Sequence, residues 1–179
     1  MITLGIDPGS LVTGYGVVQS EGKRLAGLDF GVIRTDARSP MPVRLKTIYD
    51  GLERLIETYE PERLSIETVF FGKNVQASLK LGQVRGAVMI LAMNHGMEVA
   101  EYAPREVKKA VSGGGGAAKE QVAFMVQKIL NLTDTGKFLD ATDALALAIC
   151  DANRSASPLA SHAKDWKSFI MENPHLVVR

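Results

Sequence analysis

The sequence predicts an α/β fold, with a five-stranded mixed sheet flanked by helices. Short apolar runs bounded by glycine, proline and other turn residues indicate five strands, and longer segments with apolar residues at helical spacing indicate helices. Three strands come first, and helices and strands then alternate, an order that fits a mixed sheet covered by helices. A chain of 179 residues, 46% hydrophobic, is long enough to bury one such core.

The first 34 residues predict three consecutive strands. Residues 2–7 form an apolar run that stops at Pro8-Gly9-Ser10, which indicates a short buried strand followed by a tight turn. Residues 15–19 predict the second strand, and residues 24–34, after the turn at Glu21-Gly22, predict the third. This meander order predicts that the sheet starts with antiparallel pairing.

Helices and strands alternate in the rest of the chain. From residue 42, apolar side chains recur at helical spacing until Pro61, which cannot continue a helix. The later elements are predicted as a strand at 63–67, a long helix at 74–94, a strand at 97–102, a short helix from Pro104, a helix at 118–130 and a last helix from about residue 140. We expect one domain over residues 1–153, with residues 154–179 as an appended tail.

Composition argues against a membrane or disulfide-rich protein. The longest apolar stretches, 87–93 and 144–150, fall short of the roughly 18 to 20 residues that span a bilayer. The sequence opens on a strand-like run without the features of a signal peptide, so we expect a cytoplasmic protein. The single cysteine, Cys150, has apolar neighbours and is expected to be a buried small side chain.

Positive charge is local rather than general. The net charge is only +1, so a DNA-binding surface would have to be a patch. No Asp or Glu occurs over residues 68–97, which contain Lys73, Lys80 and Arg85. A second basic cluster comprises Arg105, Lys108, Lys109, Lys119 and Lys128. Solvated helix faces would produce the same pattern, and charge alone does not separate the two interpretations.

Four acids are candidates for one site. Asp7 and Glu67 each close an apolar strand, and sites in open sheets form at strand ends. Asp140 and Asp143 are three residues apart at the start of an alanine-rich helix, which places them on one helical face. Either aspartate alone could have a purely structural role, because a negative charge stabilises a helix N-terminus.

Burial of the last helix favours a metal site over that simpler explanation. A helix as apolar as the one around Asp143 should be buried, and a buried acid costs several kcal/mol unless it is paired or metal-bound. No Lys or Arg lies between Phe138 and Asp151 to pair with it locally. Carboxylates suit Mg²⁺ or Mn²⁺, and two such ions can flank a scissile phosphate. Lys108 and Lys119 would then stabilise phosphate charge.

Several motifs together resemble one family. They are GIDPGS at 5–10, TGYG at 13–16, IETVF at 66–70 and DATDALA at 140–146, with LKLGQ at 79–83, RG at 85–86 and VKKAV at 107–111 between them. In this order and spacing they resemble the RuvC family of bacterial Holliday-junction resolvases, over about residues 1–153.

The resemblance implies an RNase H-like fold and a homodimer that nicks two strands of a four-way DNA junction symmetrically, in homologous recombination and DNA repair. It implies catalysis by Mg²⁺ or Mn²⁺, two ions per site, and the RuvA and RuvB branch-migration proteins as partners. Its catalytic and metal-binding set is Asp7, Glu67, Asp140 and Asp143. The predicted DNA-binding residues are Phe70, which would stack on junction bases, Lys73, Asn74, Arg85, Lys108 and Lys119. The sequence departs from the family at 71–72 and at 113–116. The second range is a run of four glycines, and the DNA affinity of this loop stays open.

Other interpretations remain open at this point. The strand and turn at 5–9 also resemble the phosphate-binding hairpin of actin-like ATPases and sugar kinases, although this chain is too short for their second lobe. An RNA-processing nuclease or a non-catalytic binding protein of the same fold is a further alternative. The long helix at 74–94 is apolar on more than one face, so it could contact a partner subunit or be buried in its own core. Phe70 could likewise belong to the core.

Overall fold

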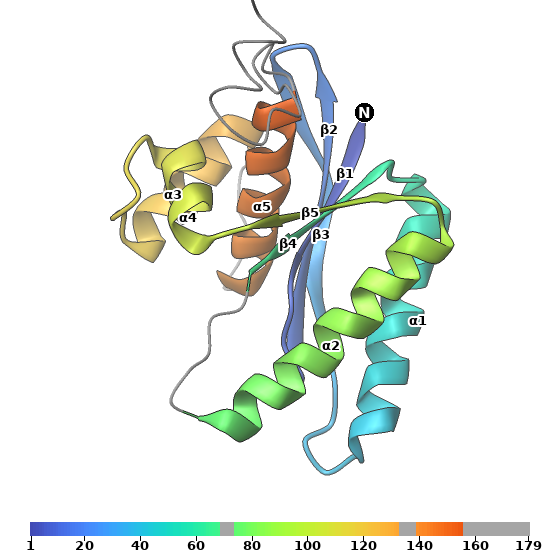
Figure 1. Ribbon diagram of the computed structural model, residues 1–179. Coiled ribbons are helices and arrows are strands. Elements are labelled where there is room, and N and C mark those ends of the chain that lie inside the picture. The colour runs from blue at the N-terminus through green and yellow to red at the C-terminus, as the bar shows by residue number, and fades with distance from the viewer. Residues whose placement is uncertain (69–73, 133–138, 156–179) are drawn as a thin grey trace, which may run out of the picture.

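The computed structural model describes residues 1–68, 74–132 and 139–155. Its five strands form one sheet in the order β3-β2-β1-β4-β5 (Figure 1). They are β1 (Ile2–Asp7), β2 (Val12–Glu21), β3 (Arg24–Arg34), β4 (Arg63–Glu67) and β5 (Glu98–Tyr102). The pairs β1-β2 and β2-β3 are antiparallel, whereas β1-β4 and β4-β5 are parallel. The predicted five-stranded mixed sheet with an antiparallel start is confirmed.

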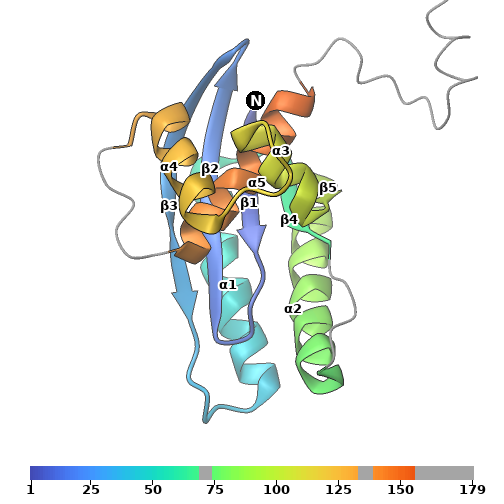
Figure 2. The same ribbon diagram turned by 90° about the vertical axis from the view of Figure 1, so that its left-hand side faces the viewer.

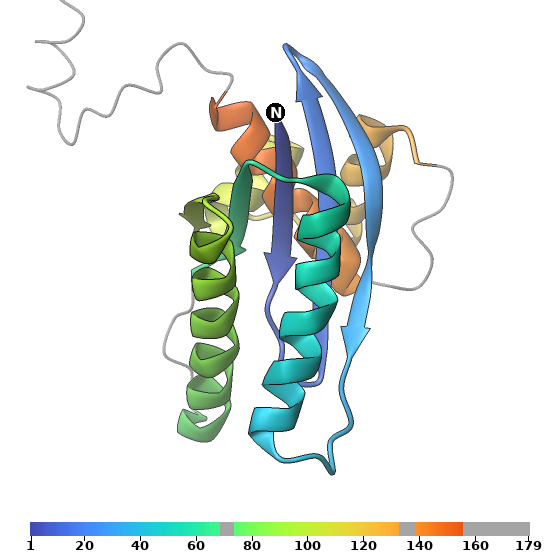
Figure 3. The same ribbon diagram turned by 90° about the vertical axis from the view of Figure 1, so that its right-hand side faces the viewer.

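Helices cover both faces of the sheet. They are α1 (Met41–Tyr59), α2 (Val75–Asn94), α3 (Pro104–Ser112), α4 (Lys119–Leu130) and α5 (Leu139–Ser155). Figures 1 and 2 show α3, α4 and α5 on one face, and Figure 3 shows α1 and α2 side by side on the other. Each layer has its own buried apolar cluster, one around Leu145 and Ile149 of α5 and one around Leu52 of α1 and Val88 of α2.

The predicted element boundaries hold closely, with two informative differences. β2 starts at Val12, three residues before the prediction, because Val12 pairs with Arg34 and the strand continues through Thr13 and Gly14. α5 extends through Ser155, two residues into the range predicted as a tail. Cys150 is buried, as expected. Within the described ranges, no helix has the length and apolar character needed to cross a membrane.

Glycines bring α5 into direct contact with the sheet. A Cβ on Gly5 of β1 would lie 2.0 Å from the carbonyl oxygen of Ala144, and a Cβ on Gly14 of β2 would lie 2.1 Å from that of Asp140. Because only glycine leaves this space free, the alanine-rich helix packs backbone against backbone. This contact places the first turn of α5 beside the ends of β1 and β2.

Candidate active site

Sheet topology brings three of the predicted acids to one place. β1 and β4 are parallel neighbours with Ile6 paired to Ile66, so the residues that follow, Asp7 and Glu67, lie at the same end of the sheet. Asp7 is also paired with Gly14 of β2, whose Cα faces the carbonyl of Asp140 in α5. The start of α5 therefore lies next to Asp7, and Asp7 and Glu67 share one end of the sheet as the strand-end argument predicted.

A pocket of about 330 Å³ opens at this end of the sheet. Asp7, Glu67 and Asp143 line it together with Lys108 of α3 and Lys119 of α4. Its apolar wall comprises Pro104, Val107, Val122, Ala146 and Leu147. The fourth acid, Asp140, is half-buried on the first turn of α5 and is not part of the lining.

The carboxylates in this pocket destabilise one another's charge. Burial, together with the negative charges of Asp143, Glu67 and Asp140, raises the pKa of Asp7 to about 7, against the opposing effect of Lys119. Burial and then Asp143 also raise the pKa of Glu67, which Lys119, Arg85 and Lys108 partly offset. Asp140 thus acts on the pocket through its charge. Negative charge exceeds positive charge in this site, which is the condition that favours binding of a cation.

Lys119 offsets part of the negative charge of the pocket. Its ammonium lies 3.0 Å from a carboxylate oxygen of Asp143, whose side chain is 31% exposed. The expectation that Asp143 is buried without a basic partner was therefore wrong. The sequence argument considered only the neighbours of Asp143 along its own helix, whereas the partner comes from α4.

The donor set fits a hard divalent cation. Asp7, Glu67 and Asp143 offer carboxylate oxygens, which Mg²⁺ and Mn²⁺ prefer. In the part of the chain that the structure describes, no three acidic, histidine or cysteine side chains lie close enough together to form a closed metal site. The three acids thus line one pocket without forming a closed cluster among the described residues, and a bound cation would offset their mutual repulsion.

The other predicted DNA-binding residues occupy different environments. The guanidinium of Arg85 is only 12% exposed and donates to the backbone carbonyl of Glu67 and to the carboxylate of Glu101. Asn74 is exposed and caps α2, since its side chain accepts a hydrogen bond from the amide of Ala77. Phe70 and Lys73 lie outside the described residues. Arg85 of α2 therefore holds the end of β4 through the carbonyl of Glu67. Its position in a basic stretch of the sequence did not indicate this role.

One buried acid was missed by the sequence argument. Asp151 of α5 is fully buried and forms an ion pair with Arg63 of β4. A signal was present, because Asp151 lies eight residues after Asp143, on the same face of the same apolar helix.

Metal binding should strengthen as the pH rises from 6 to 8. Asp7, with a pKa of about 7, must lose its proton before its carboxylate can bind a cation. At pH 6 roughly nine-tenths of this carboxyl is protonated, so we expect an affinity for Mn²⁺ roughly tenfold higher at pH 8. Calorimetry in buffers of different ionisation enthalpy would measure both the affinity and the proton release. An affinity independent of pH would contradict the raised pKa.

Comparison with known proteins identifies the family. The model of the family "Crossover junction endodeoxyribonuclease RuvC" matches residues 3–151. The protein of that name from Chloroherpeton thalassium is 52% identical over 189 residues and covers 100% of both chains. The one from Chlorobium phaeovibrioides is 49% identical and covers 99% of this chain and 100% of its own.

Solved structures give the same result. T. thermophilus RuvC in complex with Holliday junction substrate matches with a TM-score of 0.83 and 34% identity, covering 87% of this chain and 95% of that one. The yeast mitochondrial Holliday junction resolvase Ydc2, 14% identical with a TM-score of 0.61, covers 84% of this chain and 77% of its own and supports the fold alone. The predicted RNase H-like fold is confirmed, and the resolvase interpretation is favoured over a nucleotide-binding or RNA-processing domain. The chain belongs to the RuvC family of crossover junction endodeoxyribonucleases.

Proposed function

We propose that this chain is a structure-specific endonuclease that resolves four-way (Holliday) DNA junctions by two symmetric nicks, in homologous recombination and DNA repair. The observation that carries the proposal is the pocket in which Asp7, Glu67 and Asp143 lie with two lysines at one end of the sheet. Family membership supports the junction as substrate, because T. thermophilus RuvC was solved in complex with Holliday junction substrate.

We infer that Asp7, Glu67, Asp140 and Asp143 hold Mg²⁺ or Mn²⁺, two ions per site. Acids alone would repel a phosphodiester, so a pocket of this composition suits DNA only with bound cations. Bound there, the ions supply an activated water and neutralise charge on the phosphate. The raised pKa of Asp7 supports this assignment, because burial and the neighbouring acids raise it and a bound cation offsets both effects.

The basic side chains of the pocket would position the phosphate. Lys108 and Lys119 line the pocket from the helices opposite α5, so their ammonium groups can stabilise negative charge on the DNA. Pro104, Val107 and Val122 form the apolar wall, which limits access of bulk water. Lys119 has two roles in this scheme, because it pairs with Asp143 until a cation takes its place.

Replacing Lys119 with methionine should therefore separate metal binding from DNA binding. We expect the affinity for Mn²⁺ to rise severalfold at pH 8, because no ammonium competes for Asp143, and junction binding to weaken. Calorimetry and a gel-shift titration would measure the two effects. Lys128→Met is the matched control, because Lys128 lies on the same helix, against the ring of Phe124 and outside the pocket lining. An affinity for Mn²⁺ at or below that of the wild type would exclude competition by Lys119.

We also propose that α2 forms the homodimer interface. The helix buries one face, with Val84, Val88 and Leu91, against the sheet. A second face of the helix carries apolar side chains and glycines and is exposed. Burial in the chain's own core therefore does not explain its apolar character. It consists of Val75, Leu79, Gly82, Gly86, Ile90 and Met93.

The two glycines on this face favour close approach of another helix. A Cβ at Gly82 or Gly86 would have nothing within 4 Å in this chain, so internal packing does not require glycine there. Glycine in a helix costs about 1 kcal/mol relative to alanine. A partner helix at short distance supplies the missing reason, and an isologous dimer provides the two sites that symmetric cutting needs.

Further partners follow from family membership. We propose that Phe70 stacks on unpaired bases of the junction, that Lys73 and Asn74 contact its backbone, and that RuvA and RuvB act with this protein. The exposed position of Asn74 at the start of α2 supports its part.

Cleavage of a mobile four-way junction in Mg²⁺ or Mn²⁺ would test the proposed function directly. We expect paired nicks at symmetric positions on two opposing strands, and no comparable cutting of linear duplex of the same sequence. Duplex cleavage at the same rate would indicate a nuclease without junction preference.

A further inference from the structure

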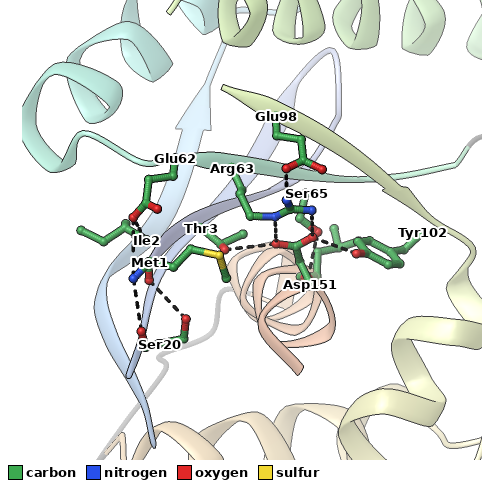
Figure 4. Close-up of polar contacts among 11 residues, drawn as sticks. Met1, Ile2, Thr3, Ser20, Glu62, Arg63, Ser65, Glu98, Tyr102 and Asp151 are labelled. Carbon is green, nitrogen blue, oxygen red and sulfur yellow. Dashed lines mark hydrogen bonds and ion pairs between the residues drawn. The ribbon is translucent and has the colours of Figure 1, made fainter. Parts of the chain in front are cut away.

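A buried carboxylate fixes the far end of α5. Asp151 is 0% exposed, and both of its oxygens accept two hydrogen bonds. Oδ1 accepts from Tyr102 Oη at 2.8 Å and from Arg63 Nη2 at 3.0 Å. Oδ2 accepts from Arg63 Nε at 2.8 Å and from Thr3 Oγ1 at 3.2 Å. Figure 4 shows these side chains converging on Asp151 from three strands.

Two of the three donor residues, Thr3 and Arg63, belong to the strands that carry the acids of the active site, and Tyr102 belongs to β5. Thr3 and Asp7 are four residues apart on β1, and Arg63 and Glu67 are four residues apart on β4. Residues four apart in a strand point to the same face, which here is the face covered by α5. The network around Asp151 thus joins β1, β4 and α5 at one end. At their other end, the same three elements carry Asp7, Glu67 and Asp143.

Helix and strands match in repeat length along this contact. One helical turn of four residues advances about 6 Å, and two strand residues advance about 6.6 Å. The same spacing therefore holds along α5 and β4, which run in opposite directions. Asp143 is level with Glu67, Leu147 with Ser65, and Asp151 with Arg63. The middle step is also bonded, because the hydroxyl of Ser65 donates to the carbonyl of Leu147 at 2.8 Å.

The contact of α5 with β1 does little to resist sliding, whereas its contact with β2 includes the side chain of Leu145 over Gly16. Ala144 and Ala148 of α5 face Gly5, where backbone meets backbone without interlocking side chains. Large side chains fix the position of one helix against its neighbours by entering grooves, and a glycine-alanine surface offers few such grooves. Against β1 and β4, directional hydrogen bonds to α5 are therefore the features that can set its axial position.

We propose that Asp151 is a positioning residue for the metal-binding acids, because its four hydrogen bonds set the axial position of α5 against β1 and β4. A slip of one residue would move Asp143 by about 1.5 Å relative to Asp7 and Glu67. Metal-ligand distances tolerate about 0.2 Å, so a fraction of that slip weakens binding. The inference rests on the proposed metal site.

Mn²⁺ affinity of the Asp151→Asn variant tests the inference. We expect at least a tenfold loss in calorimetry at pH 8, at a temperature at which circular dichroism shows the variant to be folded. Leu52→Ala is the control, because Leu52 is buried in the opposite layer and its loss lowers stability without touching α5. That variant should bind Mn²⁺ within twofold of the wild type. Equal affinity of Asp151→Asn and wild type, or an equal loss in Leu52→Ala, would overturn the positioning role.

A second variant tests the inference even if Asp151→Asn does not fold. The combined change of Thr3→Val, Arg63→Met, Tyr102→Phe and Asp151→Leu replaces the network with apolar side chains, a replacement that often preserves stability. We expect this variant to fold and still to bind Mn²⁺ at least tenfold more weakly. Wild-type affinity in the apolar variant would show that packing sets the position of α5 without Asp151. A wild type that binds no Mn²⁺ would remove the metal site and this inference together.

Discussion

Asp7→Asn is expected to abolish junction cleavage and, at the same time, to stabilise the metal-free protein at neutral pH. The amide is nearly isosteric but carries no charge, so the site loses a ligand for a divalent cation. We expect the cleavage rate to fall by about a thousandfold or more, an effect of the size found when a group that stabilises transition-state charge is removed.

The stability effect follows from the raised pKa of Asp7. In the folded protein this pKa is about 7, against 3.8 for a solvated aspartate, so the folded state binds more protons between these values. Stability of the metal-free protein therefore falls as the pH rises from about 4 to 7. Asparagine removes this dependence and should raise the free energy of unfolding by about 2 to 4 kcal/mol at pH 8, with no gain below pH 4.

Junction cleavage and urea denaturation without metal, at pH 4 and pH 8, would measure both effects. Asp50→Asn is a suitable control, since Asp50 forms only a surface ion pair with Lys46 on α1. It should change neither quantity appreciably. Retained cleavage in Asp7→Asn would remove Asp7 from the catalytic set, and an unchanged or lower stability at pH 8 would contradict the raised pKa.

Ile90→Asp is expected to convert a dimer into monomers. Ile90 is 60% exposed in the single chain, so the substitution leaves the core intact, but in the proposed interface it places a carboxylate near its symmetry mate. We expect the dissociation constant to rise by about a hundredfold or more, equivalent to at least about 2.7 kcal/mol. The monomer should lose paired cutting of the junction.

Sedimentation over a range of protein concentrations would measure this change. Val43→Asp is the matched control, because Val43 of α1 is 51% exposed but does not lie on the α2 face. It should leave the association unchanged. A wild type that sediments as a monomer at tens of micromolar, or a dimeric Ile90→Asp variant, would exclude this interface.

The sequence was most informative where function coincides with the end of a regular element. Asp7 and Glu67 close apolar strands, so their shared end of the sheet could be predicted once the strands were recognised. Asp143 could be predicted from its spacing to Asp140 and from the apolar character of its helix. These are local properties of the chain.

Pairings between distant segments could not be predicted in this way. Lys119 lies 24 residues before Asp143 on a different helix, and Arg85 appeared as part of a basic stretch until the fold placed it behind Glu67. Side-chain reach decides such contacts, and a single sequence does not encode it in any periodic pattern. For Asp151 the helical spacing from Asp143 was visible in the sequence, and only its partners on the strands were not.

The direct contact between α5 and the first two strands has a consequence for biosynthesis. Thr3 and Asp151 are 148 residues apart in the chain, and Asp143 also comes from this late segment. While the ribosome is still producing the earlier helices, the glycine-lined side of β1 and β2 has no helix to cover it, and the acidic pocket lacks one wall. A nascent or truncated chain that stops before α5 therefore has an incomplete nuclease site, so cutting ability arises only when the domain is nearly finished.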